Sequence, residues 1–486
     1  MSNREISLKG EASLLTFSKM ANLLITMATS MLLSRFRSLE EYGTFSQLSL
    51  VLNLLTTLCL LGIPNAINFF LPRVENQDEK KDFLNTFFTL NTILSIIAGG
   101  IMTLSLPLLV WFFRNNGIYG FYYFAVIMPW AKITIQERGN LLVASHKTKR
   151  LIVHTLLNSI CLLGIILLTQ IMKQDFTFYM YLYVLVEVVF GVLVYWEVSQ
   201  SAGKLSFHIN KELCKRILVF SVPIGMSDMV NTISREVDKF MIGGFLDTES
   251  LAIYTNAAKE ISLTVISTSF IAVLMPKMSK LVKEKKTNEA VDMWKDTTSF
   301  TYIFMCFGVA ALIAFAPQVM TILYSAKYLP GTGVFRIYAL ILLWRTAYFG
   351  TVLSLYGETK KILWCSISSM ILNVVFNYIF YNLFGFVGPA WSTFLAIGIV
   401  NILQLVFSSK LTGISLFDLF PWMDLLKITL VNAFCGISVY LILKVLKIGT
   451  DTRSCIIAVL IGTIWLLVYL CIMRRRIKRQ WKSSRA

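Results

Sequence analysis

The chain has 486 residues, of which 56% are hydrophobic and 15% charged, and it carries a formal net charge of +18. About 14 apolar stretches fill it, each long enough to cross roughly 30 Å of hydrocarbon. Only short polar connections separate these stretches, which leaves no room for a soluble catalytic domain. We therefore predict an all-α, polytopic membrane protein.

The predicted helices form two sets of six, followed by a final pair. The first set is expected over residues 13–34, 43–70, 83–110, 118–143, 151–171 and 176–199. The second set is expected over 217–244, 251–275, 297–324, 334–356, 361–383 and 387–409, and the final pair over 422–446 and 454–473. This division predicts an N-terminal lobe (1–205), a second lobe (206–415), and an added helix pair with a basic tail (416–486).

The first helix of each set carries a polar pattern, and the two patterns lie about 209 residues apart. They consist of Lys19, Asn22, Thr26 and Thr29, and of Asp228, Asn231, Arg235 and Asp238. Steps of three and four residues place each pattern along one face of a helix. Charged groups at membrane depth are costly unless they face water or protein. A duplicated polar face therefore predicts two homologous halves around a hydrophilic path.

The turn after the first helix of each set supports the duplication. Residues 36–45 read FRSLEEYGTF, and residues 245–254 read FLDTESLAIY at the same offset. Six helices separate the starts of the two halves, so both halves enter the membrane from the same side and form a parallel repeat. We expect two pseudo-symmetric six-helix bundles.

Positive charge is distributed unevenly among the predicted connections. With a cytoplasmic N-terminus, the basic clusters at residues 147–150, 277–286 and 474–485 all fall on the cytoplasmic side. This is the positive-inside bias that orients membrane helices. It predicts two cytoplasmic termini and explains the basic surplus without a nucleic-acid partner. The first apolar run has no cleavage-site pattern after it, so we expect a membrane helix rather than a signal peptide.

The sequence does not indicate a metal or cofactor site. Most of the eight cysteines lie in apolar stretches without CxxC spacing, as is typical of small packing residues. His146, His154 and His208 show no metal-ligand spacing with a carboxylate or a cysteine. There is also no Walker A motif and no nucleophile constellation. We expect no metal, no cofactor and no enzymatic activity.

Three stretches of the chain resemble a known family. Residues 357–394 read GETKKILWCSISSMILNVVFNYIFYNLFGFVGPAWSTF, with a Gly-x-Thr-Lys turn before a helix that carries Asn373 and Asn377. The other two are residues 221–243 (SVPIGMSDMVNTISREVDKFMIG) and 324–336 (YSAKYLPGTGVFR). With the helix count and the duplication, they resemble the polysaccharide flippase branch of the multidrug/oligosaccharidyl-lipid/polysaccharide exporter superfamily, the Wzx-type O-antigen and capsule repeat-unit transporters.

The resemblance implies two six-helix bundles facing each other in a V, with the substrate path between them and two trailing helices. It implies a flippase that moves undecaprenyl-pyrophosphate-linked oligosaccharide repeats from the inner to the outer leaflet by alternating access. The products would be O-antigen, capsule or exopolysaccharide, and the expected location is the bacterial inner membrane. Besides the lipid bilayer and the lipid-linked oligosaccharide, the expected partners are the polysaccharide polymerase and the chain-length machinery.

A pyrophosphate headgroup requires cationic side chains along its path, and arginine suits phosphate because its planar fork makes paired hydrogen bonds. The candidates within predicted helices are Lys19, Lys132, Arg138, Arg235, Lys239, Lys259 and Arg345. Local ion pairing is the alternative for several of them, namely Arg235 with Asp238, Lys239 with Glu236, Lys259 with Glu260, and Arg138 with Glu137. Lys19 and Arg345 have no acid close by in their own helices.

Other polar residues would complete the lumen. Asn22, Thr26 and Asn231 are expected to line it. Asp228, Asp238 and Glu187 are candidates for ion coupling, because burial can push a carboxylate toward neutrality. For Asp228 and Glu187, a hydrogen-bonded structural acid is the alternative.

Three other functions stay open. A lipid II flippase shares the helix count and the cationic character, and the sequence does not show which glycan is carried. A cation-coupled multidrug antiporter of the same superfamily usually has fewer helices and relies on acids, whereas the first helix here presents Lys19. A membrane-embedded polysaccharide polymerase would carry catalytic arginines in a large outer loop, which this sequence lacks.

Overall fold

A computed structural model describes residues 3–74, 76–145, 147–202, 206–259 and 263–483 of the chain. Within these ranges every regular element is a helix, which confirms the all-α class. Contacts divide the chain into two compact units, Met1–Ala252 and Ile253–Ala486.

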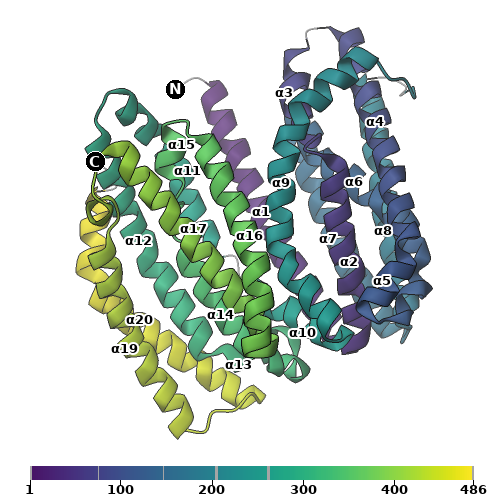
Figure 1. Cartoon of the computed structure of the whole chain (residues 1–486). Coiled ribbons are helices and arrows are strands. Elements are labelled where there is room, and N and C mark those ends of the chain that lie inside the picture. Colours follow the sequence, from purple (N-terminus) through teal and green to yellow (C-terminus); the bar gives the residue numbers. More distant parts are fainter. Residues whose placement is uncertain (1–2, 75, 146, 203–205, 260–262, 484–486) are drawn as a thin grey trace. The chain divides into compact units, whose positions relative to one another are not determined.

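The helices of the first unit follow one another along the sequence (Figure 1). They are α1 (Asn3–Phe36), α2 (Leu39–Leu60), α3 (Pro64–Phe70), η1 (Leu71–Arg73), α4 (Gln77–Leu104), α5 (Leu106–Phe113), η2 (Asn116–Phe121), α6 (Tyr122–Ala144), α7 (Thr148–Ile171), α8 (Phe176–Ala202) and α9 (Lys211–Phe245).

The boundary between the units lies within α10 (Thr248–Ala257). The second unit continues with α11 (Thr264–Lys283), α12 (Thr287–Ala314), α13 (Ala316–Tyr324), η3 (Ala326–Gly331), α14 (Thr332–Trp344), α15 (Thr351–Leu355), α16 (Thr359–Phe384), η4 (Gly385–Val387), α17 (Gly388–Thr412), α18 (Leu416–Leu419), α19 (Trp422–Val445) and α20 (Thr452–Ser483). In Figure 1, α12, α14 and α17 lie side by side in this unit, and they contact one another in that order.

The predicted apolar stretches are helical wherever the structure describes them, but several are divided into two helices. The divided stretches contain α2 and α3, α4 and α5, α10 and α11, α12 and α13, and α14 and α15. Among the described residues, 10 helical stretches are long and apolar enough to cross a membrane, and one of them, Thr359–Thr412, contains both α16 and α17. The chain is therefore a multi-pass membrane protein.

Proline and a left-handed turn account for three of these divisions. Pro107 and Pro317 occupy the first turn of α5 and α13, where a missing N–H leaves no hydrogen bond unmade. Between α2 and α3, Leu61 and Gly62 have φ angles of 44° and 73°, and Pro64 then begins the next helix.

The helix boundaries confirm the predicted duplication. Helices α4 and α12 are each 28 residues long and begin 210 residues apart, at positions 77 and 287. Pro107 and Pro317 have the same separation, and so do the starts of the 6-residue helices η2 and η3. These elements of the two halves repeat at one offset, including the proline that begins α5 and α13.

Helix α9 approaches the turn between α2 and α3 through a glycine. A Cβ atom at Gly225 would lie 2.0 Å from the Leu61 carbonyl carbon and 2.4 Å from the Gly62 nitrogen, so only glycine permits this approach. Contacts with α2, α3, α4 and α5 group α9 with the first unit, whereas the predicted second lobe begins at residue 206. Residues 203–205, at the predicted boundary between the two lobes, lie outside the described residues.

The last two helices pack on α12 of the second unit. Ile428 of α19 and Trp465 and Tyr469 of α20 are buried in one apolar cluster with Ile303. The Tyr469 hydroxyl donates to the Ile303 carbonyl at 2.9 Å. The Asn432 amide on α19 donates to the Cys306 carbonyl at 2.6 Å, which ties α19 to the same helix.

Candidate functional site

The polar pattern of α1 serves two purposes. Asn22 faces α7, where its carboxamide oxygen accepts a hydrogen bond from the Ser159 hydroxyl. Lys19 and Thr26 are both exposed. Asn22 therefore fastens α1 to α7, and Lys19 and Thr26 are the accessible members of the predicted lumen pattern.

Several ionisable side chains meet inside the first unit, where α6, α7 and α8 contact one another. We call them the acid–base cluster, which consists of Lys132, Arg138, His154, Glu187 and Glu197. Arg138 lies within electrostatic range of Glu187 and Glu197, and Lys132 lies within range of Glu187. His154 Nε2 lies 3.3 Å from Glu197 Oε1.

Three members of this cluster are buried and two are partly exposed. Glu197 is 1% exposed, Arg138 4% and Glu187 7%, whereas Lys132 and His154 are half-buried. Charges removed from water to this extent need compensation by opposite charges or hydrogen bonds. Of the predicted site residues, Lys132, Arg138 and Glu187 are thus brought together, and the acids near Arg138 come from α8 rather than from Glu137.

The sequence did not single out Glu197 or His154 as site residues. Glu197 is a second acid in the same apolar stretch as Glu187, and that repetition is the signal that could have identified it. At the solvent-exposed edge of the cluster, burial and the nearby Arg150 and Lys80 charges lower the pKa of Lys147, while the Glu197 carboxylate acts in the opposite direction.

On α9 the polar pattern splits between two faces. Asp228, Asn231 and Arg235 follow one another at steps of three and four residues on the accessible face, with Asp228 and Arg235 within electrostatic range. Asp238 is 1% exposed and accepts a hydrogen bond from the Lys239 backbone N–H at 2.8 Å. The accessible face is therefore shorter than the predicted one, and Asp238 does not belong to it.

Lys239 forms one of the predicted local ion pairs. Its Nζ lies 2.6 Å from Glu236 Oε2, three residues earlier on α9. Both side chains are about one-fifth exposed, at 19% and 18%. This pairing accounts for Lys239 without a substrate.

In the second unit, two predicted cations stand where helices are interrupted. Lys259 follows the end of α10, and its Nζ donates to the Asn256 carboxamide oxygen at 3.1 Å. It also lies 5.9 Å from the centre of the Tyr324 ring. Glu260, the predicted partner of Lys259, lies outside the described residues.

Arg345 stands at the second interruption. Helix α14 ends at Trp344, Arg345 forms its C-cap, and regular helix resumes only at Thr351. The Asn401 amide on α17 donates to the freed Trp344 carbonyl at 3.1 Å. A membrane helix tolerates such a break where a neighbour satisfies its carbonyls. In transporters, interrupted helices with their exposed termini commonly form binding sites for ions and anionic substrates.

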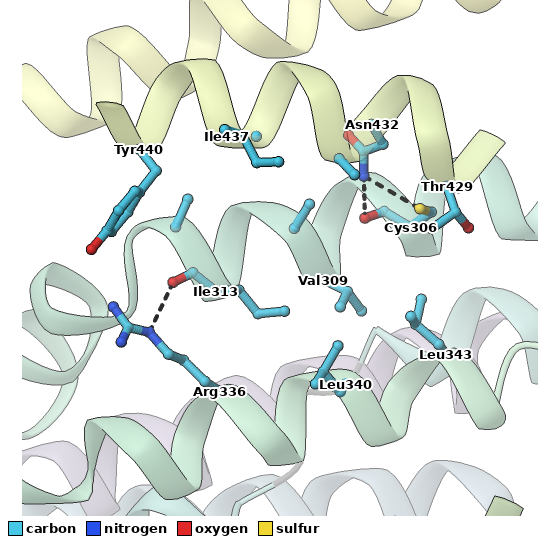
Figure 2. Close-up of a pocket in the computed structure, with 14 residues that line it drawn as sticks. Cys306, Val309, Ile313, Arg336, Leu340, Leu343, Thr429, Asn432, Ile437 and Tyr440 are labelled. Atoms are coloured by element: carbon cyan, nitrogen blue, oxygen red, sulfur yellow. Dashed lines mark hydrogen bonds between the residues drawn. The ribbon is translucent and has the colours of Figure 1, made fainter. Parts of the chain in front are cut away.

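A cavity of about 450 Å³ lies between α12, α14 and α19 of the second unit (Figure 2). Its walls are mostly apolar, with Val309, Ile313 and Leu340 in the middle. Arg336 and Tyr440 stand near one end of the view, and the Arg336 Nε donates to the Ile313 carbonyl at 3.2 Å. The sequence did not single out Arg336.

In the described part of the chain, no three His, Cys, Asp or Glu side chains are grouped closely enough to hold a metal ion.

Comparison with known proteins extends these observations. The family described as "Polysaccharide biosynthesis protein" matches residues 32–332, more than half of the chain. A comparison with curated proteins finds no match.

Solved structures share the fold at low sequence identity. The structure of "Lipid II flippase MurJ, inward closed conformation" is similar with a TM-score of 0.75 and 18% identity over 96% of this chain and 99% of that one. An inward-facing multidrug resistance MATE family transporter of the MOP superfamily has a TM-score of 0.59 and 18% identity, over 81% and 94% of the two chains. The MATE multidrug transporter DinF-BH has a TM-score of 0.56 and 14% identity, over 83% and 95%. The chain has the MOP-superfamily fold with two repeated bundles and belongs to the polysaccharide biosynthesis protein family, as its resemblance to polysaccharide flippases predicted.

Proposed function

We propose that this chain is a flippase that moves undecaprenyl-pyrophosphate-linked oligosaccharide repeat units from the inner to the outer leaflet, for the synthesis of O-antigen, capsule or exopolysaccharide. The family match supports a role in polysaccharide biosynthesis, and the similar structures named above are of flippases and transporters rather than catalytic enzymes. Transport by alternating access requires two states of the helix bundles, which repeated and kinked helices favour.

The observation that carries the proposal is the placement of Lys259 and Arg345 at two helix interruptions of the same unit. A pyrophosphate is anionic, and the cell interior is electrically negative. Outward movement of one negative charge therefore gains roughly 2.3 kcal/mol per 100 mV. Several moderate cationic positions would compensate the headgroup without trapping it. Lys259, Arg345, Arg235 on the accessible face of α9 and the exposed Lys19 of α1 are the proposed positions.

The proposed cell biology follows from the charge distribution and the family. The basic clusters favour an inner-membrane protein with both termini in the cytoplasm. A polysaccharide polymerase and a chain-length protein would use the flipped repeats on the outer side. Asn22, Thr26 and Asn231 remain proposed glycan contacts, and Asp228, Asp238 and Glu187 remain proposed coupling residues.

A second candidate is lipid II transport, which the similarity to MurJ over nearly the whole of both chains favours. Depletion of the protein in its own host separates the candidates. The proposal predicts lipid-linked repeat units on the inner leaflet and loss of surface polysaccharide, both reversed by the wild-type gene. Accumulation of lipid II with cell lysis would support the second candidate. Normal surface polysaccharide with drug hypersensitivity would overturn both in favour of a multidrug antiporter.

A further inference from the structure

The acid–base cluster contains a buried carboxylate that shares its cation. Glu197 is 1% exposed, and Arg138, which lies within its electrostatic range, also lies within range of Glu187. A charge in a protein interior carries a penalty of several kcal/mol unless an opposite charge or a hydrogen bond compensates it. A second positive charge beside Glu197 would therefore stabilise it, and a bound proton can supply that charge.

His154 is the group best placed to hold that proton. Its Nε2 lies 3.3 Å from Glu197 Oε1, and the two side chains are 17% and 2% exposed. Histidine is the side chain whose ordinary titration falls between about pH 5 and 8. A proton on His154 would convert this contact into an ion pair that compensates Glu197 independently of Arg138.

The residues around His154 and Glu197 indicate how a proton could reach this pair from water. Lys147 and Arg150 lie at the exposed edge of the cluster, where Arg150 donates to the Gln200 side chain at 3.2 Å. Lys80 at the start of α4 is close to Lys147, and deeper in the bundle Asn158 of α7 lies near Glu187. The partly exposed His154 therefore connects water at this edge with the fully buried Glu197.

We propose that His154 and Glu197 form a proton-binding site, and that the proton bound there is the coupling ion of transport. Proton binding is a property of the bundle itself, whereas the coupling rests on the proposed flippase function. With the proton bound, the His154 imidazolium compensates the Glu197 carboxylate, and Arg138 interacts with Glu187. When the proton is released to water, the Glu197 carboxylate interacts with Arg138 instead. The two protonation states thus favour two arrangements of α6 against α8.

Histidine NMR of the full-length protein in nanodiscs tests the first half. The His154 ring signal, assigned with His154→Gln, should titrate between about pH 5 and 8. Glu197→Gln should move its midpoint by about one to three pH units toward acid, as expected for loss of an adjacent carboxylate. Glu197→Asp keeps the negative charge, so the His154 midpoint should stay close to the wild-type value. If Glu197→Gln does not fold, the Asp variant still tests the site.

His208, outside the cluster, provides the matched control, because its midpoint should not respond to Glu197→Gln. A His154 signal that stays constant over this pH range overturns the proton site. So does a midpoint that Glu197→Gln leaves unchanged.

Export measurements test the coupling. Collapse of the pH gradient with a potassium–proton exchanger should slow polysaccharide export by the wild type and by His208→Gln. Glu197→Gln should lose the response to the gradient. If collapse of the pH gradient does not change the export rate of the wild type, the coupling is overturned. The proton-binding site, which the NMR titration of His154 tests, would not be affected by that result. If the wild type exports no polysaccharide, the proposed function fails, and with it the coupling.

Discussion

The two units treat charge differently at equivalent places in the repeat. Helices α6 and α14 begin 210 residues apart, at positions 122 and 332. Helix α6 runs unbroken to Ala144 and holds Lys132 and Arg138 near buried acids of α8. Helix α14 stops at Trp344, and Arg345 lies at its broken end.

This difference separates two uses of a cation in an apolar bundle. A cation enclosed with acids compensates buried charge and holds helices together. A cation at an interrupted helix, where free backbone groups also point into the structure, can exchange its partners for a ligand. We therefore expect substitution of Arg138 to affect folding most and substitution of Arg345 to affect transport most.

The largest effect should follow removal of Arg138. Arg138→Met keeps much of the side-chain volume but leaves Glu187 and Glu197 without their shared cation. We expect a loss of about 3–5 kcal/mol in the free energy of unfolding, as for breaking other buried ion pairs. Thermal or denaturant unfolding of the purified protein measures it. Arg138→Met combined with Glu197→Gln should recover part of the loss, and equal stability of the wild type and the single variant would contradict the enclosed-charge account.

Substitution of Gly225 should have the next largest effect. In Gly225→Ala the new Cβ meets the backbone of Leu61 and Gly62, so α9 must shift from the turn between α2 and α3. Overpacking of this kind costs about 1–3 kcal/mol of unfolding free energy. Gly139→Ala is the control in the same unit, because no atom outside its own helix lies within 4 Å of the new Cβ. It should be neutral or stabilise the protein by up to about 1 kcal/mol. Similar melting curves for both variants would disprove the close approach.

Arg345→Ala should leave stability nearly unchanged but reduce export. A hydrogen bond to a charged group contributes roughly 1.5–3 kcal/mol, so we expect a loss of about tenfold or more in export rate. Arg345→Lys should retain part of the rate, because it keeps the charge but loses the paired hydrogen bonds. Surface polysaccharide at equal protein level is the measurement, and the exposed Arg453→Ala is the control. If Arg345→Ala exports normally but has a lower melting temperature than the wild type, Arg345 is a structural cation like Arg138.

The smallest effect concerns the turn that both halves share. Ser38 caps α2 through the Glu41 backbone N–H at 3.1 Å, and Asp247, 209 residues later, accepts from the Ser250 backbone N–H at 2.7 Å. Ser38→Ala should lower the free energy of unfolding by about 1 kcal/mol, and Ser38→Asp should keep the cap. Equal melting temperatures of the Ala and Asp variants would show that this cap does not limit stability.

The sequence by itself determined the helical class, the multi-pass organisation and the duplication. These features follow from hydrophobic length, proline position and local spacing, all of which act within a single helix or turn. Pro107 and Pro317 illustrate this, because each fixes its kink through its own ring regardless of the neighbouring helices.

Only the tertiary structure decided which polar residues are enclosed and which are accessible. Arg235 and Asp238 are three residues apart on α9, yet Arg235 is accessible and Asp238 is buried. The meeting of His154 with Glu197, and of Arg138 with two acids of α8, joins helices that are separate in sequence. Helix periodicity gives the face of a residue but not what that face contacts, since burial is set by the packing of several helices together.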